Sequence, residues 1–232
     1  MTTITTRNLK SYYGDFQALF GVDVTFKSGE TTAIIGANGA GKTTLMKSIC
    51  GMINTTPQMI YVDDVAVGGR PAHTVIETGI AMVPEGRRLF PSLSVEENIV
   101  LGSHSHRSGP WSLERIYDLF PVLAERRHLS GTSLSGGQQQ MVSIGRALMS
   151  NPTMLLCDEI SLGLAPVIIE DLYTTIKTLK DEGMSIVIVE QDIQRALSVA
   201  DTVYCMQEGR VSLSSSAAEV SLDAIRDAYF GM

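Results

Sequence analysis

The stretch GANGAGKTT, residues 36–44, combines three glycines with a lysine and two threonines. Backbone that carries no side chain can wrap around an anion and turn its N–H groups inward. With Gly36 first and Gly41 directly before Lys42 and Thr43, the spacing fits a phosphate-binding loop. Lys42 is expected to reach the β- and γ-phosphates of a nucleotide, and Thr43 to ligate magnesium. The N-terminus of a helix at this point would add roughly half a positive charge.

The flanks of this phosphate loop favour phosphate binding over a chance glycine-rich turn. TTAII, residues 31–35, is a short β-branched run typical of a strand, and TTLMKSIC, residues 43–50, has apolar residues at helical spacing. The loop therefore joins a strand to a helix, which is the context that the phosphate-loop pattern requires.

A pair of carboxylates follows a second apolar run, MLLC. Asp158 and Glu159 stand at the end of this predicted strand, where adjacent acids are costly unless they have a function. We assign Asp158 to magnesium through water, and Glu159 to the attacking water as general base or positioner. The alternative is a pair of solvated acids that merely cap a strand. The phosphate loop earlier in the chain favours the functional interpretation.

A third motif, LSGGQQQ, residues 134–140, places a serine and two glycines at a predicted helix start. Taken alone it could be an ordinary N-cap. Ser135 Oγ and the N–H of Gly137 are also donors suited to an anion.

The elements that must position these motifs can be predicted from periodicity. Residues 1–35 alternate short strand-like pieces with turns, which predicts an antiparallel sheet that leads into the phosphate-loop strand. Residues 59–69 and 79–86 resemble further strands. From residue 153 onward, strands alternate with helices, which predicts a parallel sheet.

A helical segment is predicted between about residues 92 and 130. Ser94 and Glu97 form a possible capping box, and residues 112–127 have the apolar spacing of a helix, at Leu113, Ile116, Leu119 and Phe120. A further helix is predicted over 135–150, and Asn151-Pro152 ends it.

Composition narrows the class of function. The net charge is −7 and there is no Lys/Arg cluster, so nucleic-acid binding is not expected. The N-terminal segment is unlike a secretory signal, and no apolar run approaches membrane-spanning length. We therefore expect a cytosolic chain that is at most peripheral to a membrane. The three cysteines lie far apart in apolar surroundings and are predicted to be reduced core residues.

The ordered combination of a phosphate loop, then LSGGQ, then a strand that ends in Asp-Glu resembles the ABC-type ATPases over essentially the whole chain. The resemblance implies an α/β fold with a RecA-like parallel-sheet core, an N-terminal antiparallel β subdomain and a helical subdomain insertion. It implies one ABC ATPase domain, residues 1–232, in which 1–91 and 131–232 form the nucleotide-binding core and about 92–130 the helical subdomain.

The resemblance also implies ATP and Mg²⁺ as ligands and assigns site residues. An aromatic residue stacks on adenine in this family; Tyr13 matches it, with Tyr12 as a neighbouring candidate. The signature serine and glycines close over ATP held by the facing subunit, so a dimer is required for a complete site. The catalytic residues are expected to be Glu159, Gln191 and Lys42. The metal site is expected to use Thr43, Glu85 and Asp158. The nucleotide is expected to contact Tyr13, Gly36, Asn38, Gly39, Ala40, Gly41, Lys42, Thr43, Thr44, Ser135, Gly136, Gly137 and Gln138.

Two departures from the general pattern of ABC-type ATPases indicate one subgroup of that family. Glu85 stands where most members have glutamine, and Gln191 where most have histidine. With PEGRR, VEEN and SLGLAP, these residues resemble the ATPase subunits of bacterial importers for branched-chain amino acids and related amides. Ile160 and Asp192 differ from that subgroup's proline and asparagine and leave the solute open. Lipopolysaccharide export, urea uptake and a soluble non-transport ABC ATPase remain alternatives. A regulator without turnover is disfavoured by Glu159.

The resemblance implies partners as well. We expect a second ATPase subunit, identical or different, with a different one favoured because Glu85 and Gln191 make this site unusual. Transmembrane permease subunits should contact a groove near Arg87, Arg88, Leu89 and Phe90, in which exposed apolar side chains adjoin two arginines. A periplasmic solute-binding protein would act indirectly. The expected location is the cytoplasmic face of the inner membrane.

Overall fold

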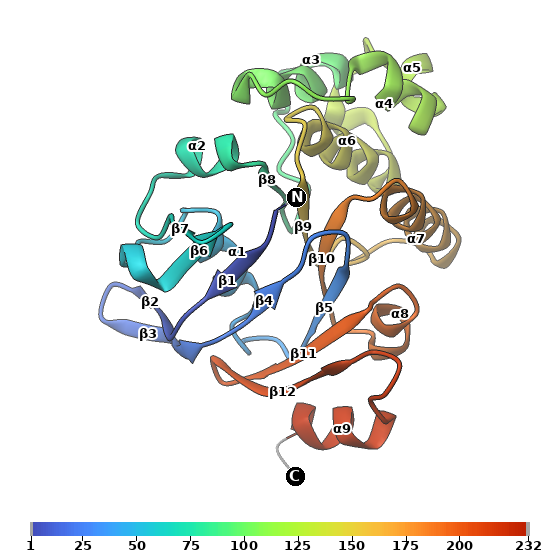
Figure 1. Ribbon diagram of the computed structural model, residues 1–232. Helices are drawn as coiled ribbons and strands as arrows, with labels where there is room; N and C mark the ends of the chain where they lie inside the picture. The colour runs from blue at the N-terminus through green and yellow to red at the C-terminus, as the bar shows by residue number, and fades with distance from the viewer. Residues whose placement is uncertain (1, 231–232) are drawn as a thin grey trace.

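A six-stranded sheet forms the centre of the computed structural model, which describes residues 2–230 (Figure 1). The strand order is β12-β11-β5-β10-β9-β8. The strands are β5 Thr31–Ile35, β8 Ile80–Val83, β9 Met154–Asp158, β10 Ser185–Glu190, β11 Thr202–Gln207 and β12 Arg210–Ser216. All neighbours pair in parallel except β11 and β12. The predicted parallel core is confirmed.

The antiparallel edge strand β12 is a difference from the predicted parallel sheet. Glu208 and Gly209 both have positive φ angles, 47° and 72°, and reverse the chain directly after β11. A two-residue turn of this kind joins antiparallel strands. The last strand therefore forms a hairpin instead of crossing over.

The N-terminal part contains the predicted antiparallel strands. One sheet has the order β4-β1-β6-β7, and β2 and β3 form a separate hairpin. The strands are β1 Ile4–Thr6, β2 Leu9–Tyr13, β3 Phe16–Val22, β4 Thr25–Phe26, β6 Ile60–Val62 and β7 Val65–Ala66.

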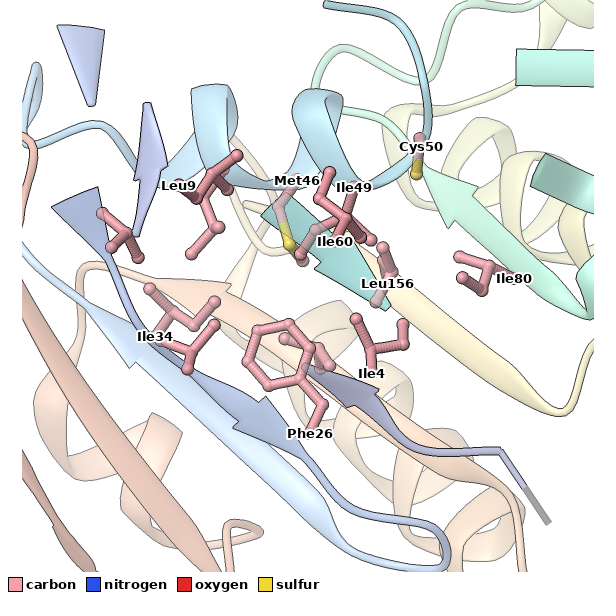
Figure 2. Packing of buried hydrophobic residues seen from close by; sticks show 14 of the residues in the cluster. Ile4, Leu9, Phe26, Ile34, Met46, Ile49, Cys50, Ile60, Ile80 and Leu156 are labelled. Carbon is pink, nitrogen blue, oxygen red and sulfur yellow. The ribbon is translucent and has the colours of Figure 1, made fainter. Parts of the chain in front are cut away.

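Helix α1, Lys42–Ile49, packs within a core that these sheets share. Figure 2 shows Met46 and Ile49 of α1 close to Ile34 and Leu156 of the central sheet, and Ile60 of the antiparallel sheet beside them. Because side chains alternate along a strand, one face of the central sheet supplies this core. The start of α1, and with it the phosphate loop, is thereby fixed against both sheets.

The other face of the central sheet is covered by helices (Figure 1). Leu155 and Ile186 pack in a second core with α6, Gly136–Leu148, and α7, Pro166–Asp181. Ala33 and Val203 pack in a third core with α8, Ile193–Leu197, and α9, Leu222–Phe230.

The segment from 92 to 130 is helical and lies beside α6 (Figure 1). It contains α3 Val95–Val100, the 3₁₀ turn η3 Leu101–Ser105, α4 Leu113–Leu119 and α5 Pro121–Glu125. The remaining short helices are η1 Pro57–Met59, α2 Ala72–Val75, η2 Ile76–Thr78 and η4 Gly131–Ser133. The boundaries of a separate helical subdomain stay a prediction.

Two expectations for this segment have different outcomes. The capping box is confirmed, since Ser94 Oγ accepts from Glu97 N at 3.2 Å and Ser94 N donates to Glu97 Oε2 at 2.7 Å. The helical spacing over 112–127 corresponds to two short helices, α4 and α5, and not to one continuous helix. Phe120 leaves the helical conformation and Pro121 begins α5, because proline has no N–H to continue the ladder of the preceding helix. Across residues 2–230, the structure contains no helix long and apolar enough to cross a bilayer.

Candidate active site

A cavity of about 900 Å³ lies where the phosphate loop meets the β2–β3 hairpin and the segments that follow β8, β9, β10 and β11. It gathers residues from most of the predicted motifs. Its lining is Tyr13, Phe16, Gln17, Ala18, Phe20, residues 38–44, Glu85, Glu159, Leu162, Gln191, Glu208, Gly209 and Arg210.

The phosphate loop joins β5 to α1 and forms the floor of this cavity. Gly41 precedes the first helical residue with φ 100°, a conformation that side-chain-bearing residues avoid. Asn38 to Thr44 line the cavity, whereas Gly36, which directly follows β5, is buried and does not line it. The helix N-terminus therefore opens toward the cavity and favours negative charge there.

The Lys42 ammonium is nearly buried, with 4% of the side chain exposed. It donates to the carbonyl oxygens of Gly36 at 2.8 Å and Ala37 at 3.1 Å. Its third contact is an ion pair with Glu159 Oε1 at 3.3 Å. A buried ammonium is costly unless it is paired, and these contacts satisfy it inside the loop.

Glu159 is held from two sides. Gln191 Nε2 donates to Glu159 Oε2 at 2.8 Å, while Lys42 contacts the other oxygen. The backbone of Glu159 is left-handed, with φ 47°, and its N–H donates to Val189 O of β10 at 3.1 Å. This unusual conformation turns the side chain out of β9 and into the cavity.

Asp158 lies beneath the cavity at the end of β9 and is fully buried. Its Oδ1 accepts from Thr43 Oγ1 at 3.1 Å, and its Oδ2 has no hydrogen-bond partner among residues 2–230. Burial raises the pKa of Asp158 to about 6; the Thr43 hydrogen bond lowers it, and the charges of Glu159 and Glu85 raise it. One carboxylate thus contacts a hydroxyl of the phosphate loop, and two more lie near enough to influence its charge.

The aromatic residues of the hairpin form one wall of the cavity. Tyr13 lines it, and its hydroxyl lies 3.4 Å from Thr44 Oγ1, whereas Tyr12 is exposed outside it. Phe16 and Phe20 line the same wall and were not predicted. No local pattern marks them, since they enter the site only because the hairpin folds over the turn between β11 and β12, where Phe20 N donates to Gly209 O at 2.9 Å.

The signature segment, residues 134–138, lies outside the cavity. Ser135 is exposed and caps α6, accepting from Gln138 N at 3.4 Å while Ser135 N donates to Gln138 Oε1 at 3.1 Å. Gly136 is partly exposed, and Gly137 is buried against Ile168 of α7. The chain does not bring its own signature segment to its own phosphate loop.

The loop after Glu85 differs in part from expectation. Phe90 is 51% exposed, but Leu89 is partly buried and packs against the core of the helical side. The expectation of two exposed apolar anchors is therefore wrong for Leu89, which the adjoining helices cover.

A family model described as ABC transporter matches residues 19–161, more than half of the chain. BraG of Pseudomonas aeruginosa, a high-affinity branched-chain amino acid transport ATP-binding protein, is 42% identical over 96% of this chain and 97% of its own. LivF of Archaeoglobus fulgidus, a probable branched-chain amino acid transport ATP-binding protein, is 32% identical over 93% and 92%. LptB of Escherichia coli K12, from the lipopolysaccharide export system, is 30% identical over 100% and 98%.

Solved structures of ATP-binding cassettes share the fold. A nucleotide-free cassette from an ABC transporter has a TM-score of 0.84 at 26% identity and covers 98% of this chain and 95% of its own. A cassette in its ADP conformation has a TM-score of 0.80 at 28% identity, with coverage of 98% and 94%. A dimeric bacterial cassette has a TM-score of 0.81 at 27% identity, with coverage of 92% and 98%.

Proposed function

Because this chain belongs to the ABC transporter family and is an ATP-binding ATPase, we propose that its ATP hydrolysis drives uptake of branched-chain amino acids or related amides through separate membrane subunits. The substrate class rests on the likeness to BraG, which at 42% identity exceeds the 30% likeness to the lipopolysaccharide-export protein. Lipopolysaccharide export is the second candidate, because that relative aligns with the whole chain.

ATP is proposed to lie in the cavity with its adenine against Tyr13 and its phosphates on the phosphate loop. The aromatic wall supplies a face for stacking, and the backbone from Asn38 to Thr44, which lines the cavity after Gly36, supplies N–H donors at a helix start. Lys42 is already at the floor of the cavity, where a phosphate oxygen would replace part of its contact with Glu159.

The residues around Thr43 fit a magnesium ion. Mg²⁺ prefers oxygen ligands, and the buried Asp158 Oδ2 has no protein partner within the described chain. The Thr43 hydroxyl would be a direct ligand, Asp158 a ligand through water, and Glu85 a further carboxylate in the cavity. When bound, the ion would neutralise phosphate charge. The three protein groups would hold and orient it.

The orientation of Glu159 is the observation that carries the proposed chemistry. One carboxylate oxygen is fixed by Gln191 and the other by Lys42, directly above the phosphate loop. Once phosphate draws Lys42 away, the freed oxygen can accept a proton from the attacking water, while Gln191 keeps the carboxylate in place. Gln191 thus acts through Glu159.

A second ATPase subunit is proposed to complete the site. Ser135 and its neighbours Gly136, Gly137 and Gln138 would close over ATP held by the partner. The partner's signature segment would cover this chain's phosphate loop. A partner of different sequence is favoured, because Glu85 and Gln191 would make the two sites unequal.

The membrane-facing surface is proposed around residues 87–90. Phe90 projects half-exposed beside Arg87 and Arg88, a suitable anchor for a short helix of a permease. The chain would then be peripheral, at the cytoplasmic face of the inner membrane, and a periplasmic binding protein would act from the other side.

Deletion of the gene in its source bacterium tests the proposal. ATP-dependent uptake of labelled leucine, isoleucine and valine should fall and should return with the wild-type chain but not with Glu159→Gln. Glu182→Gln, at a surface glutamate outside the cavity, is the matched control. Normal amino-acid uptake together with defective lipopolysaccharide export would favour the second candidate.

A further inference from the structure

Arg146 of helix α6 contacts the loop that connects the cavity to the helical segment. Its Nη1 donates to Arg88 O at 2.8 Å and its Nη2 to Arg87 O at 2.9 Å. The guanidinium carbon also lies 5.9 Å from the centre of the Phe90 ring. A forked pair of donors on two successive carbonyls fixes the path of the backbone, because guanidinium is planar and rigid.

The backbone held by Arg146 is strained. Gly86, Arg87 and Arg88 have φ angles of 73°, 64° and 48°, all left-handed. Arg88 N donates to Gly86 O at 2.6 Å, so the turn around Arg87 is a γ-turn with a positive φ at its centre, which is rare and strained. A left-handed conformation at two successive arginines requires support from the surroundings.

The same backbone sets the position of Glu85. Arg87 N donates to Pro84 O at 3.3 Å, which closes a four-residue turn with Glu85 at its second position. Gly86 supplies the positive φ that a type II turn needs at its third position. A displacement of Arg87 would therefore move the Glu85 carboxylate in the cavity.

The far end of the loop is anchored separately. The buried Asn98 of α3 accepts from Phe90 N at 2.8 Å and donates to the carbonyls of Phe90, Leu93 and Ser94 at 2.9–3.2 Å. Asn98 fixes residues 90–94 but does not reach the left-handed residues. Among residues 2–230, Arg146 donates the hydrogen bonds that join these residues to the helix that begins with the signature segment, and the guanidinium of Arg87 itself lies beside Gly136 at the start of that helix.

We propose that Arg146 is a positioning residue: it holds Arg87 and Arg88 in their left-handed conformation, and so links movement of the signature helix α6 to the position of Glu85. Only the expected effect of this link on ATP turnover rests on the proposed function. The clamp itself is a property of the folded chain.

Hydrogen exchange of the purified chain without nucleotide tests the clamp. Arg146→Lys keeps the positive charge but lacks the paired donors that bind both carbonyl oxygens in a planar fork. The amides of Arg87 and Arg88 should therefore exchange roughly tenfold faster. Adding Arg88→Gly to Arg146→Lys should restore most of the protection, because glycine adopts a left-handed conformation without strain. Arg226→Lys, on an exposed arginine of α9, is the matched control.

The outcomes separate the clamp from general packing and from the proposed function. Unchanged exchange in Arg146→Lys would overturn the proposal, and so would faster exchange that spreads over α3 and α6 and is not restored by Arg88→Gly. In the assembled transporter, Arg146→Lys should lower kcat roughly fivefold to thirtyfold with little change in KM for ATP, and Arg88→Gly should recover part of the loss. Exchange needs no turnover, so a chain without ATPase activity would contradict the proposed function alone.

Discussion

Two helix N-termini in this molecule carry glycines and hydroxyls, yet their surroundings are opposite. At α1, the phosphate loop lies over a shared core, and Lys42 is 4% exposed and fully engaged by Gly36, Ala37 and Glu159. At α6, Ser135 is exposed, and among the described residues its hydroxyl bonds only to Gln138 N of its own capping box. The N-terminus of α1 is part of a site formed by residues of this chain, whereas the N-terminus of α6 directs its donors toward the surface.

This difference explains how similar local chemistry serves two purposes. An anion at α1 meets a lysine, a hydroxyl and carboxylates from distant parts of the sequence, which can bind and transform it. An anion at α6 would meet the donors of a helix start and the guanidinium of Arg87 beside Gly136, which can bind it but cannot act as a base. The contrast predicts that variants at the start of α1 change ATP binding by the isolated chain, while variants at the start of α6 leave that binding unchanged and change turnover in an assembly.

The largest effect is expected from Glu159→Gln. An amide cannot take a proton from water, so turnover in the assembled transporter should fall roughly 10²- to 10⁴-fold while ATP still binds. Phosphate release and equilibrium binding of a fluorescent ATP analogue measure the two quantities. Glu182→Gln serves as control. Near-normal turnover would remove Glu159 from the chemistry and weaken the contrast between the two termini.

Lys42→Ala should have the next largest effect. It removes a charged donor from the phosphates and leaves the carbonyl of the buried Gly36 without its Lys42 donor, while Ala37 O still accepts from Ala40 N. Loss of a charged hydrogen bond corresponds to roughly 10- to 100-fold weaker ATP binding. Isothermal titration of the isolated chain measures this loss. Lys177→Ala, at an exposed lysine of α7, should bind ATP normally, and equal losses in both variants would contradict the assignment.

Much of the fold and of the α1 site follows from local signals in the sequence. The phosphate loop, Asp158 and Glu159 each adjoin a short apolar strand, and the central strands alternate with helices. Their convergence in one cavity follows because the carboxyl ends of parallel strands lie at one edge of a sheet.

The parts that could not be predicted depend on contacts distant in sequence or on weak patterns. Strand β12 reads RVSLSSS and has little apolar character: its Val211 packs against the first core and its Leu213 against the third, and its other residues are polar. Phe16 and Arg210 reach the cavity only through the fold of the hairpin over Gly209. The break at Pro121 was visible in the sequence, but the apolar spacing continues across it.

Ser135→Ala tests whether the start of α6 acts only on ATP that the partner subunit holds. The isolated chain should bind ATP as before, whereas turnover in the assembled transporter should fall roughly tenfold, because one phosphate donor and the helix cap are lost. Ser112→Ala removes a similar serine cap from α4, where Ser112 Oγ accepts from Arg115 N at 3.3 Å. It should cost a similar amount of stability without loss of turnover. If Ser135→Ala weakened ATP binding by the isolated chain, the proposed division between the two termini would be wrong.

The smallest effect is expected from substitutions in the aromatic wall. These substitutions test whether Tyr13 or Tyr12 stacks on the adenine. Stacking of a base on an aromatic side chain contributes about 1–3 kcal/mol by alanine substitution, and the lower value suits a residue that is half exposed. Tyr13→Ala should therefore weaken ATP binding roughly fivefold, whereas Tyr12→Ala, outside the cavity, should leave it unchanged. Titrations with ATP and GTP on both variants measure the change and show whether it depends on the base. A loss in Tyr12→Ala that equals or exceeds the loss in Tyr13→Ala would move the adenine to the other face of the hairpin. Because this wall comes from a hairpin of the same chain, Tyr13→Ala should have the same effect on binding with and without the partner subunit.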